Sequence, residues 1–151
     1  MTYLEKYKVI HRDLALRNIL LASLGQAQYL NVKVADFGLS RTVEDYYVAN
    51  TNEFPIRWCA PETIRKRQFS SKTDVWSFGI TIWELYSGGE IPYAVETMSD
   101  AAKMIVEGKI LSRPQDCPEA VYQVMKHCWE STPSLRPSFL EIFEALNQLD
   151  V

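Results

Sequence analysis

The stretch HRDLALRN, from His11 to Asn18, followed by Asp36-Phe37-Gly38, decides how this chain is expected to fold. Two short runs rich in β-forming residues, Ile19 to Ala22 and Leu30 to Ala35, lie between these motifs, and a segment that contains Gly25 separates the two runs. This arrangement predicts a small hairpin. The polar residues of both motifs are then expected at the ends of the hairpin.

The composition indicates one globular domain and excludes several kinds of partner. The chain has 151 residues, of which 47% are hydrophobic and 12% aromatic, so it is long and apolar enough to bury a core. The net charge is −3 and no block of like charges occurs, which argues against nucleic acid as a partner. No apolar run is long enough to span a membrane and residues 1–20 lack a signal peptide, so we expect no direct membrane contact from this segment.

The three cysteines, Cys59, Cys117 and Cys128, occur without the paired spacing of a zinc site. They cannot all pair with one another, so we expect reduced cysteines that serve packing in a cytoplasmic protein. A cytoplasmic location is equally compatible with a parent that is a membrane receptor carrying this segment on its cytoplasmic side.

After residue 60 the hydrophobic pattern becomes helical. Ser71 and Asp74 are spaced as a capping box, and Val75 to Tyr86 is apolar on nearly every side, which predicts a helix buried in the middle of the domain. Residues 1–8 are expected to be the end of another helix. Further predicted helices are 98–107, ended by Gly108, then 119–129, and then 139–146, which a second capping box of Ser138 and Glu141 begins.

The order of the motifs points to a family. Asn18 lies five residues after Asp13, and Ala60-Pro61-Glu62 follows the Asp36 motif. Together these motifs resemble the large lobe of a protein kinase, and the similarity runs from residue 1 to about residue 149. A chance His-Arg-Asp sequence in a turn is the alternative, but the order and spacing of three motifs argue against it.

The resemblance implies phosphoryl transfer from ATP, which needs a placed hydroxyl group and neutralised phosphate charge. Asp13 would accept the hydroxyl proton, and Arg17 would position the acceptor or balance charge. Asn18 would bind one Mg²⁺ ion, and Asp36 would bind the Mg²⁺ that bridges the nucleotide phosphates. ATP and Mg²⁺ are therefore the expected cofactors, held in part by Asn18 and Asp36.

Three features resemble tyrosine kinases more than serine/threonine kinases. Ala15 replaces the lysine that serine/threonine kinases carry two residues after the catalytic aspartate, and Arg17 supplies the cation. The run before Cys59 resembles a substrate platform, in which Pro55 would support a flat phenol ring. The platform residues are Pro55, Ile56, Arg57 and Trp58. The third feature is the Asp74-Val75-Trp76-Ser77-Phe78-Gly79 run together with the late motifs around Trp129 and Arg136.

Three charged residues are expected to support the site without acting in it. Asp74 begins an otherwise buried helix, where a carboxylate without donors would be costly. The resemblance implies that its donors are backbone amides of the catalytic loop and Arg12. It also implies a buried ion pair between Glu62 and Arg136, which would join the end of the long loop to the late helices.

The segment from Asp36 to Ala60 is polar, and we predict an irregular regulatory loop there because long loops are often functional. Tyr46 and Tyr47 follow two acidic residues, as in activation loops of the tyrosine kinase group, and are candidate phosphorylation sites. Arg12 and Arg41 are the candidate partners of the phosphate. Ordinary exposed loop tyrosines are the alternative.

The expected fold is that of a protein-kinase large lobe, mainly α-helical with a small β-hairpin, with the small N-terminal lobe absent. Residues 1–151 would form a partial kinase domain, with a catalytic loop at 11–18, an activation segment at 36–62 and a helical subdomain at 63–149. No GxGxxG loop occurs among the six glycines. We expect the missing small lobe of the same kinase as a partner, and proteins that bear tyrosine as substrates.

Two expectations follow for the segment alone. It should be inactive, and part of the 75–86 helix should be exposed as an apolar patch, so that the segment folds poorly or aggregates. A non-catalytic interaction module or truncated regulatory fragment, which binds partners through the Pro55 platform, is the alternative function. The intact Asp13, Asn18 and Asp36 argue against it, because a scaffold has no physical need for all three.

Overall fold

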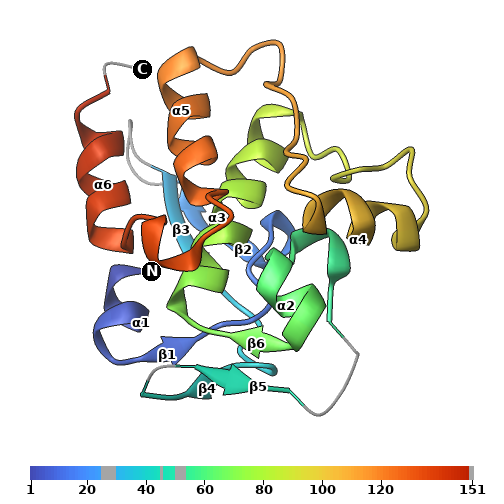
Figure 1. Cartoon of the computed structure of the whole chain (residues 1–151). Helices are drawn as coiled ribbons and strands as arrows, with labels where there is room; N and C mark the ends of the chain where they lie inside the picture. Colours follow the sequence, from blue (N-terminus) through green and yellow to red (C-terminus); the bar gives the residue numbers. More distant parts are fainter. Residues whose placement is uncertain (25–29, 45, 50–53, 150–151) are drawn as a thin grey trace.

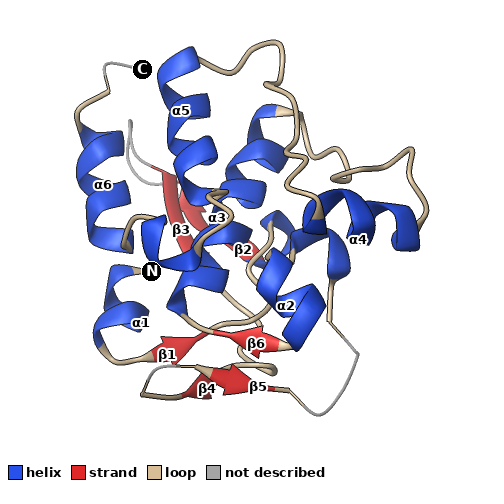
Figure 2. Ribbon diagram, viewed as in Figure 1, coloured by secondary structure: helices blue, strands red, loops and turns tan. Residues whose placement is uncertain are grey.

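The computed structural model describes residues 1–24, 30–44, 46–49 and 54–149, and it consists mainly of helices (Figure 1). The helices are α1 (Thr2–Lys6), α2 (Pro61–Lys66), α3 (Ser71–Tyr86), α4 (Met98–Val106), α5 (Glu119–Cys128) and α6 (Phe139–Asn147). Single 3₁₀ turns cover Leu16–Asn18, Ile56–Trp58 and Pro133–Leu135. The strands are β1 (Val9–Ile10), β2 (Ile19–Leu24), β3 (Leu30–Val34), β4 (Arg41–Thr42), β5 (Tyr47–Val48) and β6 (Gln68–Phe69). Figure 2 shows that α3, α5 and α6 form the body of the molecule, while β1, β4, β5 and β6 lie together at its lower edge.

The predicted hairpin is present as the antiparallel pair β2–β3. Ile19 pairs with Val34 and Leu21 with Val32, and the register shifts once between Leu21 and Ser23. The predicted turn around Gly25 lies outside the described residues. Beyond the paired ends, the Ala35 amide donates to the Asn18 carbonyl at 2.8 Å. The hairpin therefore brings the end of the predicted catalytic loop beside the residue that precedes Asp36.

The prediction of an irregular segment from Asp36 to Ala60 is wrong in part. Two short strands occur within it: β4 pairs with β1, and β5 pairs with β6, with Tyr47 opposite Phe69. Helix α2 was not predicted, although Pro61 occupies its first turn, a position that suits proline. Elements of two to six residues hold too few side chains to display a hydrophobic period, so they depend on partners distant in sequence.

Helix α3 is the centre of the core, as its apolar sequence predicts. Eleven of its residues are buried, among them Trp76 and Trp83, and it packs against α5. Gly79 allows this close contact, because a Cβ atom there would lie 2.7 Å from the Trp129 Nε1 and 2.8 Å from the Cys128 Cβ. All three cysteines are buried and free, as expected.

The expected apolar patch on α3 is not observed. Leu85 is the one large apolar side chain of this helix among the exposed hydrophobic residues, at 62% exposure. Other elements of the described chain cover the remaining faces, and the side chains of Leu14 and Met125 are fully buried in the same core. Exposed apolar side chains lie elsewhere, among them those on the hairpin (Leu20, Leu21, Val32), on α1 and just after it (Tyr3, Tyr7) and on α6 (Leu140, Phe143).

The start of α3 differs from the predicted capping box of Ser71 and Asp74. The cap is Ser70, whose side chain accepts from Lys72 N, and Thr73 Oγ1 accepts from the Ser70 amide in return. The actual box is one residue earlier than predicted, which leaves the Asp74 carboxylate available for other donors. The second predicted box is confirmed: the Glu141 amide donates to Ser138 Oγ, and the Ser138 amide donates to Glu141 Oε2.

Candidate active site

The predicted catalytic loop, residues 11–18, is held at its start by the carboxylate of Asp74, which is 2% exposed. The His11 amide donates to Asp74 Oδ2 at 2.7 Å, and the Arg12 amide donates to Oδ1 at 3.0 Å. Arg12 has a φ of 72°, so its backbone adopts the left-handed conformation that this double contact requires. Burial raises the pKa of Asp74 from 3.8 to about 7, while the two amide donors oppose the rise. The two backbone amides donate to Asp74 as predicted, whereas the Arg12 guanidinium, also predicted as a donor to Asp74, donates to the Leu39 carbonyl.

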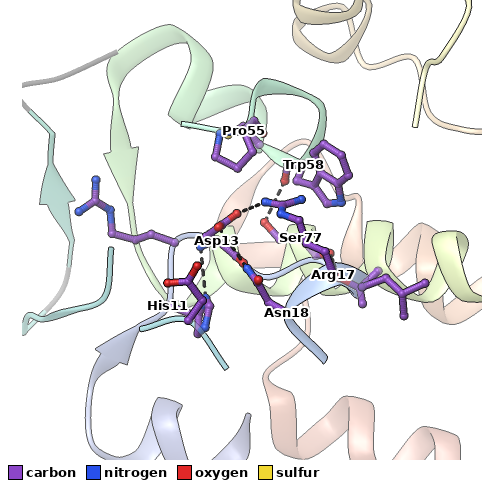
Figure 3. A network of polar contacts seen from close by, with 12 residues as sticks. His11, Asp13, Arg17, Asn18, Pro55, Trp58 and Ser77 are labelled. Carbon is purple, nitrogen blue, oxygen red and sulfur yellow. Dashed lines mark hydrogen bonds and ion pairs between the residues drawn. The ribbon is translucent and has the colours of Figure 1, made fainter. Parts of the chain in front are cut away.

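Asp13 is the centre of a compact polar cluster (Figure 3). Asn18 Nδ2 donates to the Asp13 carbonyl at 2.7 Å and to Asp13 Oδ2 at 3.1 Å. Arg17 Nη2 forms an ion pair with Asp13 Oδ1. Asn18 and Arg17 therefore fix the Asp13 carboxylate from two sides. The Asp13 side chain is 15% exposed, so it still reaches the surface. Three of the predicted site residues therefore meet in space.

Asp36 follows Ala35, whose amide donates to the Asn18 carbonyl of this cluster. Its φ is 61°, and the Gly38 amide donates to its Oδ1 at 3.3 Å. Asp36 is exposed, whereas Asn18 is buried. A His11 ring nitrogen lies 3.0 Å from the Ala35 carbonyl, and the His11 ring contacts Phe37 edge to face at 4.9 Å. Burial lowers the pKa of His11, which favours the neutral ring in this contact.

The donor set of Asn18 and Asp36 suits magnesium. Among the residues that the structure describes, no group of three or more His, Cys, Asp or Glu side chains forms a metal centre by itself. Mg²⁺ usually takes one or two protein oxygens and completes its shell with water and substrate phosphates. The amide oxygen of Asn18 and the exposed carboxylate of Asp36 match this coordination preference, and phosphate and water oxygens would take the remaining positions.

The four platform residues are placed by separate contacts. Ser77 Oγ of α3 donates to the Trp58 carbonyl at 2.8 Å. Arg57 donates to the carbonyls of Pro92, Tyr93 and Glu96, so its guanidinium fastens the platform to the loop after α3. Pro55 and Trp58 line a small cavity together with Asp13. Ile56 begins the 3₁₀ turn and is half-buried.

The expected pair of Glu62 and Arg136 forms a two-point contact. Arg136 Nη1 and Nη2 lie 2.7 Å and 2.8 Å from the two carboxylate oxygens of Glu62. The Arg136 side chain is fully buried and also donates to the carbonyls of Glu130 and Lys72, while its guanidinium lies 5.0 Å from the Trp76 ring. This pair joins α2 to the segment that precedes α6.

A family model described as protein tyrosine and serine/threonine kinase matches residues 1–146. The chain belongs to this kinase family. The kinase chain is 47% identical to the ephrin type-A receptor 5 of Gallus gallus. It is 45% identical to the tyrosine-protein kinase transforming protein Abl of Abelson murine leukemia virus, and each match covers 99% of the kinase chain. It is 44% identical to the tyrosine-protein kinase HTK16 of Hydra vulgaris over 94% of its length. The kinase chain spans between 15% and 20% of the length of these relatives.

The two tyrosines of the predicted activation segment have different surroundings. Tyr46 is 57% exposed, whereas Tyr47 is half-buried in β5. The Arg12 guanidinium lies between two rings, 4.8 Å from that of Tyr47 and 4.4 Å from that of Phe69. Arg12 Nη1 donates to the Leu39 carbonyl, but its buried Nε has no hydrogen-bond partner among the described residues. The other candidate, Arg41, is exposed and donates to the Ser40 carbonyl.

Sequence reasoning missed one polar residue of the kinase site, Glu84. This glutamate belongs to the last turns of α3 and is 7% exposed. Its Oε2 accepts from the Leu16 amide of the predicted catalytic loop and from Trp58 Nε1 of the predicted platform, each at 2.9 Å. A carboxylate within an apolar helix needs donors, the same argument that identified Asp74, so the signal was present in the sequence.

The kinase chain has no helix, within its described ranges, that is long and apolar enough to cross a membrane.

Proposed function

We propose that this chain is the large lobe of a protein tyrosine kinase, which transfers the γ-phosphate of ATP to tyrosine in protein substrates when a small lobe completes the domain. The observation that carries the proposal is the Asp13 carboxylate, which Asn18 and Arg17 fix at the surface, while the residue before Asp36 donates its amide to the Asn18 carbonyl. In this proposal residues 11–18 are the catalytic loop, 36–62 the activation segment and 63–149 the helical subdomain.

Each residue of the cluster has a role that its contacts support. Asp13 accepts the proton of the substrate hydroxyl, and Arg17, paired with Asp13 Oδ1, positions the acceptor and balances charge. Asn18 and Asp36 would hold Mg²⁺, which would supply positive charge beside the transferred phosphate. Protein kinases use ATP and Mg²⁺ in general, and this donor set is compatible with both.

Tyrosine as the acceptor is supported by the residues around Asp13. Ala15 is fully buried, so the position that carries lysine in serine/threonine kinases offers no cation here. The Arg17 guanidinium instead lies 4.7 Å from the Trp58 ring, beside Pro55 in the same cluster (Figure 3). A phenol is longer than a serine side chain and reaches Asp13 from further out, over the apolar faces of Pro55 and Trp58.

Replacement of Asp13 by asparagine in the complete kinase domain tests the catalytic role. Asparagine keeps the shape but cannot accept the proton, so phosphate transfer to a tyrosine peptide should be abolished while ATP binding is retained. Asp116→Asn is a matched control, because Asp116 is exposed and lies outside the cluster. Full transfer activity in Asp13→Asn would refute the assignment.

Regulation by phosphorylation of Tyr46 or Tyr47 is part of the proposal. A phosphate on either residue would add acceptor oxygens, for which the candidate partners are Arg12, whose guanidinium lies 4.8 Å from the Tyr47 ring, and the exposed Arg41, and such contacts can order a loop. The double substitution of Tyr46 and Tyr47 by phenylalanine should remove the activation of the complete domain on preincubation with ATP. Unchanged activation would contradict it.

We further propose that these 151 residues have no transfer activity alone and act on the cytoplasmic side of any membrane. The phosphates need a glycine-rich loop and a lysine paired with a helix glutamate, and the sequence contains no GxGxxG. A transfer assay with the 151-residue segment next to the complete domain tests this. A non-catalytic binding role is the competing function, and it predicts partner binding that survives Asp13→Asn.

A further inference from the structure

The end of α2 presents three consecutive cations to solvent. Arg65, Lys66 and Arg67 are all exposed, and none of them forms an ion pair with another residue that the structure describes. The exposed Lys103 and Lys109 of the neighbouring segment, by contrast, each pair with an acid close by in sequence. Acidic residues outnumber basic ones in this chain, 19 to 16, so partners are not scarce. The positive charge at the end of α2 is therefore not neutralised within the described ranges.

The backbone beneath these cations is held in place. The Arg67 amide donates to the Thr63 carbonyl at 2.8 Å, and the Arg67 carbonyl accepts from the Ala49 amide at 3.0 Å. Arg65 Nη2 donates to the Val106 carbonyl at 2.6 Å, which ties the first cation to α4. The three charges lie on an ordered turn, so a ligand that binds them would not have to order a loop.

Folding alone does not account for this charge. The negative end of a helix dipole favours a cation, but the effect is confined to the last turn, and α2 has only six residues. Arg67 has a φ of 55°, in the left-handed region that glycine adopts most readily. A long cationic side chain thus occupies a position at which the backbone favours glycine. A solvated helix end without a partner is the alternative.

The number of cations indicates the kind of partner. Anionic membranes are bound by clusters of about four to eight cations, and specific DNA complexes commonly neutralise about six to ten phosphates. Both exceed the three cations of this turn, and the net charge of −3 opposes both surfaces. A short acidic segment of a protein needs only a few carboxylates. The two arginines suit it, because a guanidinium can bind a carboxylate at two points.

The cations lie within reach of the candidate active site. Helix α2 begins at Pro61, three residues after Trp58 of the predicted platform, and leads to β6 (Figure 1). Three residues of chain and a helix of this length together span at most about 20 Å. An extended polypeptide covers that distance with about six residues. A segment bound at the end of α2 can therefore belong to the same polypeptide as a tyrosine placed at Asp13.

We propose that Arg65, Lys66 and Arg67 form a docking site for an acidic segment of the protein substrate, about six residues away from the acceptor tyrosine. This inference rests on the proposed tyrosine kinase function and adds a determinant of substrate choice outside the predicted catalytic loop and platform. The docked segment makes no contact with the reacting groups. Docking should therefore lower the KM for the substrate and leave kcat and the KM for ATP unchanged.

The test uses tyrosine peptides that carry a run of glutamates, one for each cation, beyond a spacer of about six residues. The run is placed before the tyrosine in one peptide and after it in another, and glutamines replace it in matched peptides. For at least one placement, the complete domain should show a KM about tenfold lower for the glutamate peptide, and added salt should reduce this difference. Equal KM values for both placements would overturn the proposal.

Two substitutions locate the effect on the protein. Lys66→Gln together with Arg67→Gln should raise the KM of the glutamate peptide to that of the glutamine peptide. A fall in kcat with both peptides would overturn the proposal, since it indicates a structural role. Lys66→Glu together with Arg67→Glu should instead favour a peptide with lysines in place of the glutamates, and no such reversal would contradict the charge pairing.

A matched control removes the same charge elsewhere. Lys6→Gln together with Lys103→Gln takes two exposed cations from α1 and α4 and should leave the KM of the glutamate peptide unchanged. A rise equal to that of the Lys66 and Arg67 variant would overturn the proposal, because net charge alone would then explain the preference.

A binding assay distinguishes failure of the docking site from failure of the underlying function. A fluorescent glutamate peptide without tyrosine should bind the complete Asp13→Asn domain, as measured by anisotropy, and bind about tenfold more weakly after Lys66→Gln and Arg67→Gln. Phosphate transfer to tyrosine without this binding would overturn the docking site and leave the kinase function intact. Binding without any transfer by the wild-type domain would refute the kinase function, and with it the role in substrate choice, while the acidic-segment site stands.

Discussion

Removal of Glu62 should be among the most destabilising single changes in this chain. Glu62→Ala leaves the guanidinium of Arg136 fully buried and removes both carboxylate bonds, at 2.7 Å and 2.8 Å. The carbonyls of Glu130 and Lys72 still accept from it, but no opposite charge remains in this contact. A buried charge stripped of its partner typically costs about 3–5 kcal/mol. Since domains are stable by only about 5–15 kcal/mol, this loss is a large fraction of the total.

Urea unfolding of the complete domain, followed by tryptophan fluorescence, measures this cost. Trp76 lies against Arg136, so the signal reports on the same region. The double variant Glu62→Ala with Arg136→Met removes both charges and should recover much of the loss. Glu107→Ala, which breaks the exposed pair with Lys109, is the control and should change stability by less than about 1 kcal/mol. A Glu62→Ala loss as small as that of the control would refute the reasoning, and so would a double variant that loses the sum of both single effects.

Three further predictions concern stability. Folding raises the pKa of Asp74 from 3.8 to about 7, so the folded state binds the proton more tightly than the unfolded state. The Asp74 contribution to the free energy of unfolding should therefore fall as the pH rises from about 4 to about 7, by up to about 4 kcal/mol. Asp74→Asn should remove that part of the pH dependence in urea titrations at several pH values, and identical slopes would contradict it. Gly79→Ala forces a Cβ against Trp129 and should cost about 1–3 kcal/mol, measured by thermal unfolding. Ser138→Ala removes the cap of α6 and should cost about 1 kcal/mol in the same assay, and no change in Tm would contradict the capping role.

The long periodic elements were predictable because their signal is local. The apolar run of α3 and the helical spacing in α5 and α6 follow from residues within each element, and so does the β2–β3 hairpin. The start of α3 was misassigned by one residue, since Ser70 and Ser71 are equally suitable caps in sequence. The difference matters because a capping role would have occupied Asp74, which instead binds the amides of His11 and Arg12.

The candidate site was predictable where a motif is contiguous. Asp13, Arg17 and Asn18 meet as their order suggested, because a short loop and a 3₁₀ turn bring them together. Contacts between distant segments were not predictable in the same way. Arg57 was assigned to the platform, but the loop after α3 that binds its guanidinium gives no sequence signal for this contact. The stacking of Arg12 on Phe69 likewise depends on the pairing of β5 with β6.

Helix α3 carries a carboxylate near each end, and both bind backbone amides of the 11–18 loop: Asp74 binds those of His11 and Arg12, and Glu84 binds that of Leu16. The two are ten positions apart, which at 1.5 Å per residue is about 15 Å along the helix. The spacing of the two carboxylates along the helix thus sets the distance between the two parts of the loop that they bind. A one-residue insertion between its carboxylates would turn one of them by about 100° away from the loop, although the hydrophobic composition of α3 would scarcely change. The number of residues between Asp74 and Glu84 is therefore constrained by their bonds to the loop, independently of how α3 packs in the core.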